Sequence, residues 1–243
     1  EAYKVKVSAD ASSRLQGYEC NAAVTAVPVA AGWNWLGYPV NQSMTVAEAL
    51  AFYEASEGDY IVGQDGYALF ADGEWKGDLE GLTPGKGYMF KAMSSSDIVF
   101  NNTIVSVAGS RMGQRNYLIN SPWAPAKYGY PNVMPLTAEL YVDGGKANAD
   151  EFIVAAFCDS ECRGVGMWKE GRLVMTVYGD GGEDIHFVAK NLTDGVYYDI
   201  TEQVGFAADN VGTWHAPYAL TVGGESTNVE ELSSALSVTP NVV

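Results

Sequence analysis

The chain has 243 residues, of which 47% are hydrophobic and 18% charged, and its 14 basic and 30 acidic residues give a formal net charge of −16. The apolar content is sufficient for packed cores and excludes a chain that is disordered throughout. The negative charge argues against nucleic acid and anionic membrane surfaces as partners, because both repel an acidic protein.

The first predicted domain spans residues 1–105 and is β-rich (α+β), with short strands and one helix. Thr45 and Glu48 have the spacing of a capping box, and apolar side chains follow on one helical face, so we predict a helix at about residues 43–57. Dipeptides containing Gly or Pro separate the other apolar segments, which is typical of strands joined by tight turns. The predicted strands cover residues 3–7, 33–38, 60–62, 67–70 and 88–91.

Residues 101–136 are less regular, and four prolines interrupt them. We predict a linker at residues 106–126, because exposed proline-rich segments commonly separate domains. Residues 127–243 consist of short apolar segments separated by Gly and Asp turns, a pattern typical of an antiparallel, immunoglobulin-like β-sandwich, here with a C-terminal tail. The fold class is therefore predicted as mainly β. The strands expected in this second domain cover residues 136–142, 152–157, 173–178, 185–189, 196–200, 204–207 and 218–222.

The chain has few residues of the kinds that catalysis uses. Its two histidines, His186 and His215, have no second His or Cys at zinc-ligand spacing, and no nucleophile elbow or phosphate-binding loop occurs in the sequence. A glycosidase needs two carboxylates across a groove. The densest acidic cluster, Asp180, Glu183 and Asp184, lies in a Gly-rich turn that we expect to be solvated. We therefore predict that the chain is not an enzyme.

No cofactor is expected, and a structural calcium ion is the one alternative. Clustered oxygen ligands in a loop suit Ca²⁺, although the spacing of an EF-hand does not occur here. The residues that would supply these oxygens are Asp143, Asn148, Asp150 and Glu151.

Two of the three cysteines, Cys158 and Cys162, flank the predicted hairpin tip at residues 159–161, and the third is Cys20. Across such a tight turn, two cysteines four residues apart can meet the geometry of a disulfide, which an exporting cell would permit. We predict this bond for exported protein, and the alternative is a pair of reduced thiols on the turn.

Six tryptophans are candidates for a binding surface, because exposed indole rings stack on sugars and peptides. Trp75 and Trp168 lie in short polar segments flanked by glycines, and we predict that these two rings are exposed and contact a ligand. Trp33 and Trp35 share one face of a predicted strand, and we expect that face to be buried in the core.

Residues 32–39 read Gly-Trp-Asn-Trp-Leu-Gly-Tyr-Pro, and residues 154–165 read Val-Ala-Ala-Phe-Cys-Asp-Ser-Glu-Cys-Arg-Gly-Val. Together with Leu-Thr-Pro-Gly-Lys-Gly-Tyr at residues 82–88, these segments resemble a pair of C-terminal modules of large secreted and surface proteins of Bacteroidetes. Residues 236–243 are similar to the opening of the sorting domain that follows such modules. The resemblance implies export and a role in adhesion or substrate presentation, and it names no ligand.

From these observations we predict a non-catalytic interaction or adhesion module, secreted or on the cell surface, that is a fragment of a longer surface protein. Its expected partner is a glycan or a protein. The alternative is an accessory carbohydrate-binding module of a secreted hydrolase. No apolar run reaches the ~18–20 residues that a membrane-spanning helix needs, so we expect no integral membrane segment.

Overall fold

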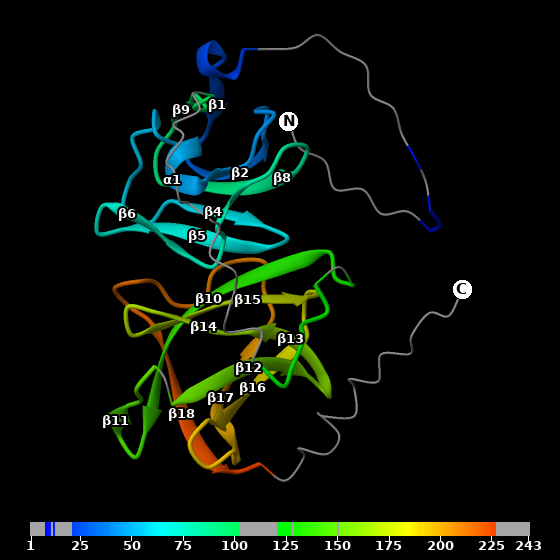
Figure 1. Cartoon of the computed structure of the whole chain (residues 1–243), viewed down its shortest axis with the longest axis vertical. Helices are drawn as coiled ribbons and strands as arrows, with labels where there is room; N and C mark the ends of the chain where they lie inside the picture. The colour runs from blue at the N-terminus through cyan, green and yellow to red at the C-terminus, as the bar shows by residue number, and fades with distance from the viewer. Residues whose placement is uncertain are drawn as a thin grey trace. The chain divides into compact units, whose positions relative to one another are not determined.

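The computed structural model describes residues 8–10, 12, 21–102, 121–127, 129–149 and 151–226. The chain divides into two compact units (Figure 1): an N-terminal unit of Glu1–Gly63 and Tyr67–Met112, and a C-terminal unit of Gln64–Gly66 and Gly113–Val243. Both units are built mainly of β-strands, which confirms the predicted fold class. Several predicted features lie outside the described residues: the strand at residues 3–7, Cys20, Asp150, most of the linker and the C-terminal tail.

The N-terminal unit contains the only α-helix among the described residues, together with nine short strands and one 3₁₀ turn. In chain order the elements are η1 (Ala22–Val24), β1 (Val27–Val29), β2 (Gly32–Gly37), β3 (Met44–Thr45), α1 (Val46–Ala49), β4 (Tyr60–Gly63), β5 (Gly66–Ala71), β6 (Glu74–Gly77), β7 (Gly81–Leu82), β8 (Gly87–Ala92) and β9 (Ser96–Ile98). Five strands form one sheet in the order β2-β8-β4-β5-β6, while β1 pairs with β9 and β3 pairs with β7.

The alternation of side chains along β2 and β8 decides which residues form the core of this unit. Leu36 and Phe90 face the core, where α1 adds Val46 and Ala49. Each of the larger side chains, Leu36, Phe90 and Val46, contributes roughly 1.5–3 kcal/mol when it leaves water. Side chains of the other parity, which include Trp35, point to the opposite face of the sheet.

The predicted helix at residues 43–57 is wrong in its length, because α1 ends at Ala49. Its predicted start is confirmed: the Thr45 side chain accepts a hydrogen bond from the Glu48 N–H, and Glu48 Oε2 accepts one from the Thr45 N–H at 3.0 Å. The capping box therefore begins one turn of helix, and the residues that follow Ala49 form turns and a loop.

Asp59 organises the segment after α1. Its side chain is fully buried, and its carboxylate accepts hydrogen bonds from the Tyr53 hydroxyl at 2.9 Å, the Ser56 N–H at 2.7 Å and the Met93 N–H at 2.7 Å. A continuing helix would direct the Ser56 N–H to a carbonyl one turn earlier and leave this buried carboxylate short of donors, which is costly. Tertiary hydrogen bonds thus replace helical ones: the Ala49 carbonyl accepts from the Asn101 N–H at 3.0 Å, and Asp59 accepts from the Met93 N–H just after β8.

The C-terminal unit is a curled sheet, whose main path runs β13-β12-β16-β17-β18-β10-β15-β14 (Figure 1). Its strands are β10 (Asn132–Val142), β11 (Gly145–Lys146), β12 (Phe152–Cys158), β13 (Glu161–Val165), β14 (Met167–Lys169), β15 (Arg172–Gly179), β16 (Asp184–Asn191), β17 (Tyr197–Gly205) and β18 (Tyr218–Glu225). The strand pairs are antiparallel except β10 with β18, which is parallel. Because β13 also lies beside β15, the two ends of the sheet approach each other and enclose a core.

Two apolar clusters lie on the two faces of this sheet. The inner cluster includes Leu136, Phe187 and Leu220, and the outer cluster includes Phe157 and Trp123. Trp123 lies in the predicted linker at residues 106–126, yet its ring makes edge contacts with Phe157 and Tyr197, each at 5.6 Å between centroids. The described end of that linker therefore covers the outer face of the C-terminal unit.

Replacement of Asp59 by alanine should lower the stability of the N-terminal unit by about 3–5 kcal/mol, because one buried and two partly buried donors lose a charged acceptor. Urea unfolding with hydrogen exchange on peptides from residues 21–102 measures this unit separately. Asp97→Ala is the matched control, since Asp97 is exposed on β9. Equal effects of the two substitutions would contradict the organising role of Asp59.

Candidate functional site

Trp75 was expected to be exposed, but it is half-buried against the core of the N-terminal unit. The two-residue turn at Asp72 and Gly73, both with positive φ, ends before it, so Trp75 lies on β6 rather than at a loop tip. Its ring contacts Phe70 at 5.4 Å and Phe90 at 6.3 Å between centroids. Trp75 therefore fills space at the edge of the core.

Trp168, which we also predict to be exposed, is half-buried as well, because it too lies on a strand and not at a loop tip. The turn at Glu170 and Gly171 follows it, so Trp168 lies on β14 and packs against the inner cluster of the C-terminal unit. Its indole N–H donates to the Phe152 carbonyl at 2.8 Å, which fixes the ring in place. The sequence indicated hairpins here, but it did not show which residue begins each turn.

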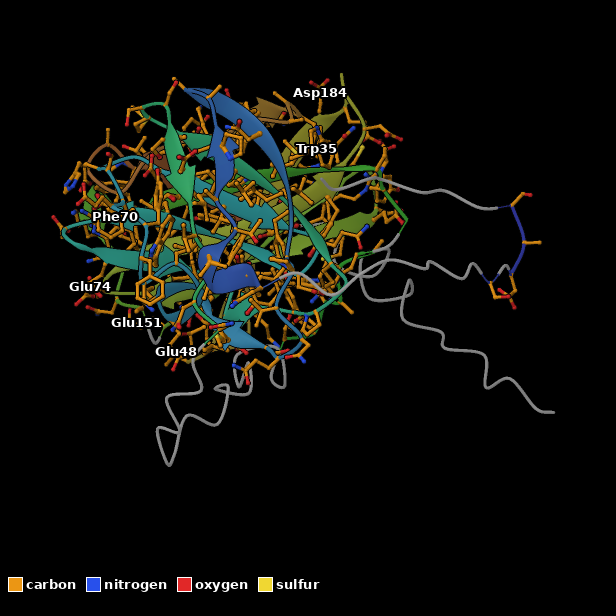
Figure 2. All side chains as sticks on the ribbon, turned by 90° about the horizontal axis from the view of Figure 1, so that it is seen from above. Trp35, Glu48, Phe70, Glu74, Glu151 and Asp184 are labelled. Atoms are coloured by element: carbon orange, nitrogen blue, oxygen red, sulfur yellow. The ribbon has the colours of Figure 1, made fainter. Side chains whose placement is uncertain are left out.

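Trp35 is the most prominent exposed aromatic residue on a strand, with 51% of its surface accessible, although we expected it to be buried (Figure 2). It shares its face of β2 with the half-buried Trp33, while Leu36 takes the core position. The sequence of β8 contains a signal for this orientation. Its charged residue, Lys91, alternates with the buried Phe90, so Lys91 and its cross-strand partner Trp33 face away from the core.

We call Trp33, Trp35, Met89 and Lys91 the aromatic face. The register pairs Trp33 with Lys91 and Trp35 with Met89 across β2 and β8. The Lys91 ammonium lies 5.4 Å from the centroid of the Trp33 ring, within the range of a cation–π interaction. This face combines indole surface, a thioether and a cation, and it includes β2, the last strand of its sheet.

In the acidic turn of the C-terminal unit, at residues 180–184, Glu183 forms an ion pair with Arg163. Arg163 binds both carboxylate oxygens of Glu183, at 3.1 and 2.9 Å, and the Asp180 N–H donates to Glu183 at 2.6 Å. The hydrogen bonds from Arg163 hold the pKa of Glu183 below its ordinary value. A general acid in a glycosidase needs the opposite shift. Asp184 is exposed nearby (Figure 2).

A β-bulge places Arg163 in this cluster. The pairing of β12 with β13 joins Phe157 to Cys162 and Ala156 to Gly164, so Arg163 is the extra residue. Its side chain is almost fully buried, and its guanidinium carbon lies 3.5 Å from the centroid of the Tyr130 ring. This stacking and the Glu183 pair compensate the buried charge from two sides.

The same guanidinium has a weaker third partner. Glu161 lies 3.2 Å from the Arg163 Nε, in an ion pair that lacks hydrogen-bond geometry. The Tyr130 hydroxyl donates to Glu161, and burial together with this bond raises the pKa of Tyr130 to about 12. The cluster is thus an internal charge network of the fold.

A second network, which the sequence did not indicate, surrounds the buried Glu139 on β10. Lys146 lies 2.8 Å from its Oε1, Arg172 contacts the same oxygen, and the Tyr141 hydroxyl donates to Oε2 at 2.9 Å. Burial raises the pKa of Glu139, but hydrogen bonds from Lys146 and Tyr141 and the charge of Arg172 outweigh it and leave the pKa lowered. Glu139 therefore acts as a charged acceptor.

His186 and the candidate metal ligands show no catalytic arrangement within the described part of the chain. The His186 ring stacks on Phe157 at 5.8 Å, and burial lowers its pKa. The described residues contain no group of three or more His, Cys, Asp or Glu side chains that could hold a metal ion. Asn148 instead donates to Glu151 at 2.9 Å, and a calcium site remains a prediction because Asp150 lies outside the described residues.

Cys158 and Cys162 are free thiols, so the predicted disulfide is not formed in the structure. The register explains why: Cys162 lies opposite Phe157, and Cys158 lies opposite Glu161. Cys162 belongs to the outer cluster, whereas Cys158 packs against the inner one. Side chains on opposite faces of a hairpin point apart, and a disulfide would require the backbone to move.

No protein-family model, curated protein or solved structure matches the chain. Among the described residues, the structure contains no helix with the length and apolar character that membrane crossing requires.

In a Cys20→Ser variant, we expect Cys158 to react with a thiol reagent at least about tenfold faster than Cys162, because the thiolate is the reactive form. Burial raises the pKa of both thiols, and that of Cys162 reaches about 12. Peptide mapping of the labelled, non-reduced protein measures both rates. A peptide that joins Cys158 to Cys162 in protein purified without reductant would contradict the structural result.

Glu183→Gln should destabilise the C-terminal unit near neutral pH and much less in acid. The lowered pKa of Glu183 means that its ion pair stabilises the fold above the unfolded-state pKa of about 4.3, and that this stabilisation is lost as the pH falls through the folded-state pKa. Urea unfolding of wild type and variant between about pH 7 and about pH 3 tests the effect. Asp184→Asn is the control, since Asp184 is exposed. A constant difference between wild type and Glu183→Gln across this range would contradict it.

Proposed function

We propose that this chain is a non-catalytic interaction module that binds its partner through the aromatic face of the N-terminal unit. The observation that carries the proposal is Trp35, which is half-exposed on an edge strand beside Trp33. An exposed indole in a monomeric protein costs solubility, and rings of this kind are enriched where proteins bind ligands. The cation of Lys91 beside the rings adds a polar group that can orient a ligand.

The charged groups of the C-terminal unit support binding over catalysis. Glu183 and Glu139 are each held by cations, and both have lowered pKa values. A carboxylate with a lowered pKa is a poor proton donor near neutral pH. Of the sequence candidates for general acid chemistry, Glu183 is therefore better explained as part of an internal ion pair.

Carbohydrate binding is the second candidate, because the exposed Trp35 ring offers a flat apolar surface on which the CH face of a sugar can stack. We also propose that the chain is secreted or on the cell surface, which the resemblance of residues 32–39 and 154–165 to modules of secreted Bacteroidetes proteins supports. An adhesive module and an accessory module of a hydrolase would both use such a surface.

Glycan arrays and a displayed peptide library, screened with the full chain, test the proposal. We expect binding without product formation, and Trp35→Ala should weaken it by about tenfold or more, because Trp35 is the most exposed residue of the aromatic face. Phe52→Ala is the matched control, since Phe52 is a similarly exposed aromatic residue outside the aromatic face. Turnover that a single Asp→Asn or Glu→Gln substitution removes would refute the proposal, as would equal binding by Trp35→Ala and wild type.

A further inference from the structure

We propose that the C-terminal unit binds an acidic segment of a partner protein through three cations: Lys146 on β11, Lys169 on β14 and Arg172 on β15, together called the cationic cluster. The cluster belongs to a different unit from the aromatic face, and the inference goes beyond the binding function proposed above. It follows from the strand register, from the local charge and from the hydrogen bonds that hold Arg172.

The strand register gathers the cationic cluster around Glu139. Lys169 pairs with Arg172 across β14 and β15, one position along from Leu173, which faces the inner cluster. Because side chains alternate along a strand, Lys169 and Arg172 lie together on the opposite face of the sheet. Lys146 and Arg172 both contact Oε1 of Glu139. Three cations therefore share one surface with a single carboxylate.

The cationic cluster has more positive charge than Glu139 balances. Among the described residues, Glu139 is the one carboxylate in an ion pair with Lys146 or Arg172, and no carboxylate forms an ion pair with Lys169. Three cations and one carboxylate leave a local charge of +2, in a chain whose net charge is −16. Like charges directly opposite each other on neighbouring strands are destabilising, so the Lys169–Arg172 pair suits a surface that an anion compensates.

Arg172 is already held in one orientation. Its Nε donates to the Trp214 carbonyl at 2.9 Å, its Nη1 donates to Glu139, and its guanidinium carbon lies 5.6 Å from the Trp214 ring centroid. These bonds use two of the five N–H groups of a guanidinium, and 24% of the side chain is accessible. Arg163, in contrast, is 5% accessible and donates from both Nη atoms to Glu183. The fixed fork of Arg172 can bind an anion with little further loss of conformational entropy.

A carboxylate is the anion that these donors suit. Glu139 already accepts from both Lys146 and Arg172, so the spacing of the two cations matches that group. Trp214, the ring that contacts Arg172, is 5% exposed and offers no surface on which a sugar could stack. The accessible part of the cationic cluster thus consists of charged donors, which favours the acidic side chains of a polypeptide over a saccharide.

N-acetyl-tetraglutamate and the matching tetraglutamine peptide are the probes, because they differ in charge and share a backbone. Calorimetric titration of the full chain at low salt should show at least about tenfold tighter binding of tetraglutamate, since charge-assisted hydrogen bonds are lost with glutamine. Added salt should reduce this preference. The double variant Lys146→Gln/Lys169→Gln should remove it. Arg172→Lys, which keeps the charge and loses the fork, should weaken it by less.

Lys190→Gln is the matched control, since Lys190 lies on β16 outside the cationic cluster, and it should leave the preference unchanged. Equal binding of the two peptides, or a preference that the double variant retains, would overturn the proposal. Tetragalacturonate that binds more tightly than tetraglutamate, and only when Lys146 and Lys169 are present, would replace the polypeptide by an acidic saccharide.

A stability measurement tests the cationic cluster without a ligand. Lys169→Gln should raise the midpoint of urea unfolding of the C-terminal unit while it weakens tetraglutamate binding, because it removes one member of a like-charge pair. A lower midpoint in this variant would show that Lys169 stabilises the fold, and would contradict a surface that needs an anion for compensation.

Discussion

Burial of β12 on both of its faces is the constraint on which the C-terminal unit depends. Alternate residues of Phe152–Cys158 enter the inner and the outer cluster, so this strand cannot face water on either side. The outer face needs a cover, and Trp123 supplies it through edge contacts with Phe157 and Tyr197. The same alternation separates Cys158 from Cys162. Cys162 pairs with Phe157 and points into the outer cluster, whereas the next residue of β12, Cys158, points to the inner one. A bond between these sulfurs would take one thiol out of its cluster.

The bulge at Arg163 determines which residue of β13 points into the inner cluster. One extra residue on β13 shifts the parity, so that Gly164 takes the inner position close to Met175 and the Thr176 carbonyl, where a side chain would clash. The displaced Arg163 is then nearly buried, and a lone buried guanidinium is costly. Glu183 and Tyr130 compensate this charge, and the turn after β15 is thereby tied to β13. Glu183, one carboxylate of a turn that the sequence predicts to be solvated, is thus used to satisfy a buried cation.

The N-terminal unit illustrates the opposite situation at β2, because α1 and the loops cover one face of its sheet. Leu36 and Phe90 gain burial on that face, while Trp35 lies on the other face with 51% of its surface accessible. Asp59 contributes to this arrangement, because its three hydrogen bonds fix the loop after α1 next to β8. The position of the aromatic face therefore depends on which face of the sheet α1 covers. The hydrophobicity of β2 does not contain this information, so the sequence prediction placed Trp35 in the core.

The sequence by itself determined the β class, the position of most strands and the start of α1, because these depend on alternation, turn residues and a capping box within a few residues. It did not determine the end of the helix at Ala49, whose carbonyl accepts a hydrogen bond from the distant Asn101 N–H. Nor did it determine which tryptophans are exposed, since Trp35 and Trp75 differ only in the face of the sheet that the rest of the chain covers. The pairing of Arg163 with Glu183, twenty residues away, arises from a bulge and a turn that meet only in the folded unit. Local patterns decide which elements form, and long-range packing decides which of their side chains remain available to a ligand.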